Sequence, residues 1–136
     1  MDPLARDQFE TLVGEVFDTF PTDIAHFFDN VAILIADRPT RTQQRAADRG
    51  LLLGLYEGVP RIEREGHNAF YPDRITLFQG ALIAVSPTAV ALRRNVAVTL
   101  WHEIGHHLGF PDAKLHQIER RILRHVRVSG RASQPS

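Results

Sequence analysis

The stretch TLWHEIGHHLGFPD, residues 99–112 of this 136-residue chain, constrains the fold more than any other part of the sequence. It ends a long segment whose apolar positions fall almost all round a helix: Val90, Ala91, Ala97, Val98, Leu100, Trp101, Ile104 and Leu108. We therefore expect a helix that is buried over much of its surface. Ser86 followed by Pro87 predicts its N-cap and first turn. Gly109 predicts its end, because glycine readily takes the left-handed conformation of that position.

Polar residues interrupt this apolar helix in a particular spacing. His102 and His106 are four residues apart, so they lie on one face and can bind the same metal ion. Glu103 is displaced around the helix and would lie beside a water molecule on that ion, where a general base is needed. This H-E-x-x-H pattern on a helix is typical of zinc peptidases.

A zinc site of this kind requires a third protein ligand and leaves the fourth position for water. Gly109 allows a sharp turn, and Asp112 follows three residues later, so the turn can return its carboxylate to the ion. The resulting frame is H-E-x-x-H-x-x-G-x-x-D, the metzincin spacing with aspartate in place of the last histidine. His116 and Glu119 on the next helix are alternative ligands, although the glycine turn favours Asp112.

Two further residues are candidates for contacts around the ion or with substrate: His116 and Tyr71. His107 is rotated by about 100° from its neighbour on the helix and should face away from the ion.

A purely structural interpretation must be weighed against the metal site. His106 and His107 could complement the C-terminus of one helix, and Asp112 the N-terminus of the next. That interpretation accounts for each residue singly. It leaves Glu103 unexplained, because an unpaired charge on an otherwise buried helix is strongly unfavourable.

Composition limits the remaining possibilities. Cysteine is absent, so the fold holds no disulfide and any metal site must use histidine and carboxylate ligands. Basic and acidic side chains balance to a formal net charge of zero, which predicts no nucleic-acid and no membrane partner. The N-terminus lacks the pattern of a signal peptide, and we expect a cytoplasmic protein.

The rest of the chain predicts an α+β domain over residues 1–128, followed by a flexible tail over 129–136. Helical spacing favours helices at 3–20, at 22–30 and from 111 onward, with Asp2 and Pro3 as the first cap. Apolar runs predict strands at 31–37, 51–60 and 73–80. The polar segment at 38–50 predicts a mobile loop or a frayed helical turn, and the segment at 61–72 a polar loop. Gly54 inside the second strand suggests a close backbone approach or a bulge.

Three segments, LLLGLYEGVPR, YPDRITLFQG and HEIGHHLGFPD, resemble in sequence and order the minimal zincin-like metallopeptidases of bacteria. The resemblance implies a small three-stranded mixed sheet packed on the active-site helix, with flanking N- and C-terminal helices. It also implies Zn²⁺ bound by His102, His106 and Asp112, with Glu103 as the base. The only methionine is Met1, so the Met-turn of ordinary metzincins is missing.

Few residues follow Asp112, so we expect an open, shallow cleft, and the sequence identifies no donor for an oxyanion. The first hypothesis is a zinc metallopeptidase that pairs a peptide or protein substrate with a sheet edge near residues 51–56. The alternatives are a non-proteolytic, metal-stabilised binding module and a metallohydrolase of non-peptide amides. In either case a partner protein or a homodimer could complete the cleft.

Overall fold

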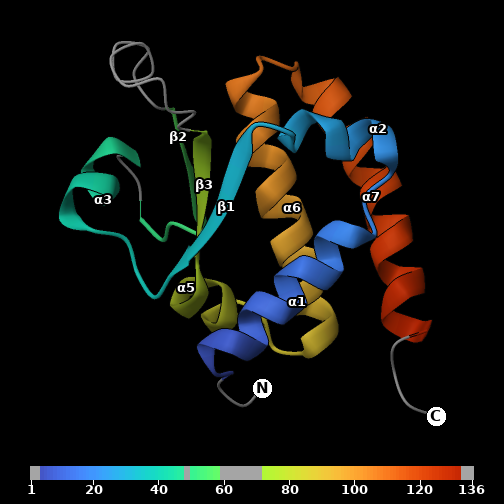
Figure 1. Cartoon of the computed structure of the whole chain (residues 1–136), viewed down its shortest axis with the longest axis horizontal. Coiled ribbons are helices and arrows are strands. Elements are labelled where there is room, and N and C mark those ends of the chain that lie inside the picture. The colour runs from blue at the N-terminus through green and yellow to red at the C-terminus, as the bar shows by residue number, and fades with distance from the viewer. Residues whose placement is uncertain (1–3, 48–49, 59–71, 133–136) are drawn as a thin grey trace.

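The computed structural model describes residues 4–47, 50–58 and 72–132, and the side chains up to 126 (Figure 1). Along the chain the elements are α1 (Arg6–Asp18), α2 (Thr22–Ala25), the 3₁₀ turn η1 (His26–Phe28), β1 (Val31–Ala36), α3 (Arg41–Ala47), β2 (Gly54–Glu57), β3 (Asp73–Phe78), α5 (Gln79–Ala84), α6 (Ala89–His107) and α7 (Asp112–Ala132). This is the α+β arrangement that the sequence predicts.

The strands form a three-stranded mixed sheet in the order β1-β3-β2, with β1 parallel and β2 antiparallel to the central β3. Phe78 N–H donates to the carbonyl of Leu53 at 3.0 Å, which fixes the alternation of hydrogen bonds between β2 and β3. In an antiparallel pair, every second residue then turns its N–H and C=O away from its partner. On β2 these residues are Gly54 and Tyr56, which face the outer edge of the sheet.

Helix α6 lies at the centre of the molecule, between the sheet and α7, and α1 also packs against it (Figure 1). Its buried side chains join one core with residues from α1, β3 and α7: Phe9, Val16, Ile75, Leu77, Leu92, Leu100, Trp101, Ile104, Leu115 and Ile122. The indole Nε1–H of Trp101 donates to the carbonyl of Leu115 at 2.9 Å, which ties α6 to α7 inside this core.

Two glycines allow neighbouring elements to approach α6 closely. A Cβ on Gly54 would lie 2.6 Å from Cγ2 of Thr99, so β2 presses directly onto the helix. A Cβ on Gly105 would lie 2.2 Å from Cδ2 of Leu115, which shows how closely α7 packs on the same helix. The close approach predicted at Gly54 is confirmed.

The end of α6 matches its prediction, whereas its start differs. Gly109 has φ +80° just past the helix, in the left-handed region predicted for it. The predicted N-cap at Ser86 is wrong: α6 begins at Ala89, and Thr88 Oγ1 accepts from the N–H of Ala91 at 3.0 Å. The Ser86 hydroxyl instead donates to the carbonyl of Leu82 at 2.5 Å, because the short helix α5 occupies the preceding residues.

Other boundaries shift by a few residues. The polar segment at 38–50 contains the helix α3, the second strand is confined to Gly54–Glu57, and the third ends at Phe78. Helix α7 runs to Ala132. The division of the chain at residue 128 stays a prediction. The predicted cap at Asp2 and Pro3 lies outside the described residues. Within the described chain, no helix is both long and apolar enough to span a bilayer.

Candidate metal centre

The last two turns of α6 present the histidine pair. The ring centroids of His102 and His106 are 5.7 Å apart and the rings are nearly perpendicular. His102 is partly exposed and His106 exposed, so both imidazoles lie at the surface of the protein. Two imidazoles on adjacent turns of one helix face suit a shared zinc ion, as their spacing predicts.

Glu103 lies partly buried beside this pair, and it has a specific partner. Its Oε1 accepts a hydrogen bond of 2.9 Å from the backbone N–H of Tyr56 on β2. Burial raises the pKa of Glu103, while the Tyr56 amide and the nearby His106 and His102 act in the opposite direction. The carboxylate is therefore held by an outward-facing amide of the edge strand.

The side chain of Tyr56 is itself fixed on both sides. Its hydroxyl donates to Oδ2 of Asp73 at 2.5 Å, and its ring stacks on His107 with centroids 3.9 Å apart. His107 therefore packs against β2, a contact that the sequence analysis missed. This contact depends on pairing between residues 51 positions apart, for which the local sequence gives no signal.

The turn after α6 is the one that the sequence predicts. Gly109 N–H donates to His106 C=O at 3.1 Å and Phe110 N–H donates to Gly105 C=O at 3.0 Å, which together form a Schellman motif. Phe110 then packs against Trp101, with ring centroids 5.7 Å apart. The turn thus redirects the chain from α6 into α7.

Asp112 is the first residue of α7 and is exposed. Among the described residues, no group of three or more histidine, cysteine, aspartate or glutamate side chains is gathered closely enough to hold a metal ion. The histidine pair and the nearby carboxylates have the donor chemistry of a zinc site. Asp112 as the third ligand therefore remains a prediction.

Helix α7 brings two further polar residues to the histidine pair. Oε1 of Glu119 lies 2.5 Å from Nε2 of His102, and the ring of His116 has its centroid 6.4 Å from that of His102. The sequence offers both as alternative ligands, and His116 also as a contact near the ion. Tyr71, the other proposed contact, lies outside the described residues.

The sequence profile of the zincin-like metallopeptidases matches residues 28–122. This range begins in η1 and includes the whole sheet, α6 and the first half of α7. The chain therefore belongs to the zincin-like metallopeptidase family. A search of curated proteins found no match.

Proposed function

We propose that this protein is a zinc-dependent peptidase that hydrolyses peptide bonds. His102, His106 and Asp112 would hold the zinc ion, which when bound would polarise the scissile carbonyl and activate a water molecule. The observation that carries the proposal is the position of Glu103, a partly buried carboxylate next to the histidine pair and held by the Tyr56 amide. Its spacing in the motif and its environment both suit a general base.

Glu103 would take a proton from the attacking water and deliver it to the leaving amine. Burial raises the pKa of its carboxyl group, which makes the carboxylate a stronger base than an exposed glutamate. The hydrogen bond from Tyr56 fixes one carboxylate oxygen, so the side chain is oriented before substrate arrives. Glu119 contacts Nε2 of His102 and would orient this ring from α7 for a zinc ion bound at Nδ1, because an orienting carboxylate binds the ring nitrogen that is not on the metal.

The outer edge of β2 is the proposed place for the substrate backbone. Tyr56 faces this edge and is partly exposed, whereas Gly54 is buried, and an extended peptide can add to an exposed edge as a further strand. A strand bound there would lie beside Glu103. The Tyr56 N–H already donates to Glu103, so it would hold the base and would not pair with the substrate. This position agrees with the sequence expectation for residues 51–56 and shifts it slightly toward the C-terminus.

The test is to replace Glu103 while keeping the metal. Glu103→Gln should retain zinc in elemental analysis of the purified protein and lose hydrolysis of a broad peptide library, read by mass spectrometry. His106→Ala should lose both zinc and hydrolysis. Hydrolysis that survives in zinc-loaded Glu103→Gln would contradict the proposed role of this residue.

The same digest distinguishes the alternatives. The second candidate is a non-proteolytic, metal-stabilised binding module of the same fold. If the zinc-loaded wild type cleaves no peptide of the library, this result would support that module or a hydrolase of non-peptide amides. Activity that appears only at high protein concentration, or with added cell lysate, would indicate a homodimer or a partner protein that completes the cleft.

A further inference from the structure

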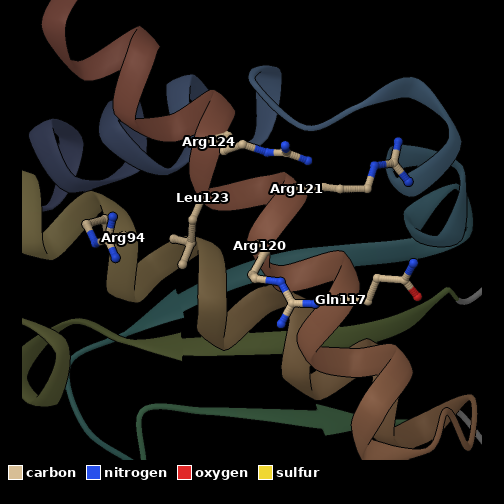
Figure 2. A pocket seen from close by; sticks show the side chains of 6 residues that line it. All are labelled: Arg94, Gln117, Arg120, Arg121, Leu123 and Arg124. Atoms are coloured by element: carbon tan, nitrogen blue, oxygen red, sulfur yellow. The ribbon is translucent and has the colours of Figure 1, made fainter.

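An arginine-rich hollow lies over α7 beside α6, and Figure 2 labels the side chains that line it. We call it the arginine hollow. It has a volume of about 590 Å³ and is lined by Arg94 on α6 and by Gln117, Arg120, Arg121, Leu123 and Arg124 on α7. It contains none of the residues proposed above for catalysis.

Most of the positive charge in the arginine hollow is not neutralised. Arg121 is paired with Asp23, to which its guanidinium donates two hydrogen bonds of 3.1 Å. Arg94, Arg120 and Arg124 form no ion pair or hydrogen bond with any residue in the described part of the chain. Three guanidinium groups around one hollow constitute a ready site for a carboxylate, which arginine binds in a bidentate manner.

One side of the arginine hollow, formed by Arg94 and Leu123, lies in line with the histidine pair. On α6 the incompletely buried residues Arg94, Val98, His102 and His106 follow one another at intervals of four, so they form one stripe along the helix. On α7 the stripe of Asp112, His116, Glu119 and Leu123 has the matching helical spacing.

A contact at one end and a shared hollow at the other place these stripes beside each other. His102 contacts Glu119 at one end, while Arg94 and Leu123 line the same hollow at the other.

The separation along this line matches a few residues of substrate. Arg94 and His102 are eight residues apart in a helix, which corresponds to about 12 Å along its axis. An extended peptide rises by about 3.3 Å per residue, so about four residues would bridge this distance.

We propose that the arginine hollow is a specificity subsite that binds an acidic side chain of a peptide substrate, about four residues from the bond that is cleaved. This inference rests on the proposed peptidase function. Leu123 supplies an apolar wall for the methylene groups of a glutamate, and the arginines bind its carboxylate. A nucleic acid is a poorer fit, because its continuous negative charge would meet Glu119 and Asp112 along the same line.

Binding can be measured without catalysis, using Glu103→Ala as the background. The probes are two fluorescein-labelled peptides of alanine, leucine and glycine. One carries a pair of glutamates near one end, and the other carries glutamines at the same positions. Each probe is made with the pair at either end, since the direction of the peptide is not fixed. Fluorescence anisotropy at low salt should show about tenfold tighter binding of the glutamate peptide, as a few partly exposed ion pairs would give.

The matched variants carry three substitutions each. Arg94→Gln with Arg120→Gln and Arg124→Gln should abolish the preference for glutamate. The control variant removes the same charge beside and within α3, and it should preserve the preference for glutamate. Its substitutions are Arg38→Gln, Arg41→Gln and Arg45→Gln. Arg121 is left intact because it pairs with Asp23.

Equal preference for glutamate in the two triple variants would overturn the inference, and so would tighter binding of a single-stranded oligonucleotide of equal charge. Failure of the proposed function would be detected by a separate measurement, in which the zinc-loaded wild type cleaves no peptide. If the wild type does cleave, moving the glutamate pair along a substrate should move the cleaved bond by the same number of residues. In the triple variant of Arg94, Arg120 and Arg124, the position of cleavage should no longer follow the glutamate pair.

Discussion

At the scale of single residues, the site depends on which carboxylates support the histidine pair. Glu119 contacts His102 directly, whereas Asp112 is exposed at the start of α7. A carboxylate next to a ligating histidine fixes the orientation and tautomer of the ring and increases its basicity. Glu119 should therefore contribute to metal affinity even if Asp112 is the third ligand.

Glu119→Gln keeps the size of the side chain and removes its charge, so we expect zinc affinity to fall about 10–100-fold. Asp112→Asn should cause a larger loss, because it would remove a ligand. Competition with a chromophoric chelator measures both, and circular dichroism checks that the fold is kept. Glu10→Gln on the exposed face of α1 serves as the charge control. Equal affinity in Glu119→Gln and Glu10→Gln would exclude a role for Glu119.

The residues that sequence spacing could predict are those that share one helix. His102, Glu103 and His106 follow from helical geometry alone, since their relative positions are set within two turns. Their partners come from other elements: the Tyr56 amide from β2 and the Glu119 carboxylate from α7. These contacts depend on how separate elements pack, which helical periodicity does not encode.

At the scale of elements, the distance between α6 and α7 is set by Gly105, the glycine inside the H-E-x-x-H pattern. A Cβ there would lie 2.2 Å from Leu115, which is buried and has little room to move. Gly105→Ala should therefore push the helices apart and destabilise the fold by about 1–3 kcal/mol, because overpacking outweighs the better helix propensity of alanine.

Gly14→Ala is the matched control for this substitution. Gly14 lies inside α1 and a Cβ there would meet nothing within 4 Å. Alanine should then stabilise the protein by about 0.5–1 kcal/mol through helix propensity and a less flexible unfolded chain. Urea unfolding measures both variants. A Gly105→Ala protein as stable as Gly14→Ala would show that the helices yield easily to the added methyl group.

Local signals at element ends were predictable where only one residue type satisfies the backbone. Gly109 was correctly assigned because a positive φ at this position favours glycine. Ser86 and Thr88 are both good N-caps, and the sequence does not show that Ser86 is used by the end of α5. The helix α5 was missed because six residues are too few to display a helical period.

At the scale of the whole molecule, an ion pair joins the helix α2 near the N-terminus to the C-terminal helix α7. Asp23 in α2 and Arg121 in α7 are 98 residues apart in sequence, and the pair lies beside the arginine hollow. The hydrogen bonds from Arg121 lower the pKa of Asp23 below its ordinary value of 3.8. A carboxyl group with a lowered pKa stabilises the folded state above its unfolded pKa. This contribution is lost as the pH falls through the lower, folded pKa.

Arg121→Gln should therefore return the pKa of Asp23 toward 3.8. The part of the free energy of unfolding that this pair supplies, and that wild type loses as the pH falls, should then be absent at every pH. A pH titration of the Asp23 carboxyl carbon by NMR measures the first effect, and unfolding at a series of acidic pH values measures the second. Arg120→Gln removes the same charge one residue away, where no ion pair forms within the described structure. If Arg120→Gln raised the pKa of Asp23 as much, the shift would come from the general positive field of α7. Only a shift confined to Arg121→Gln would identify the contact between α2 and α7 as its cause.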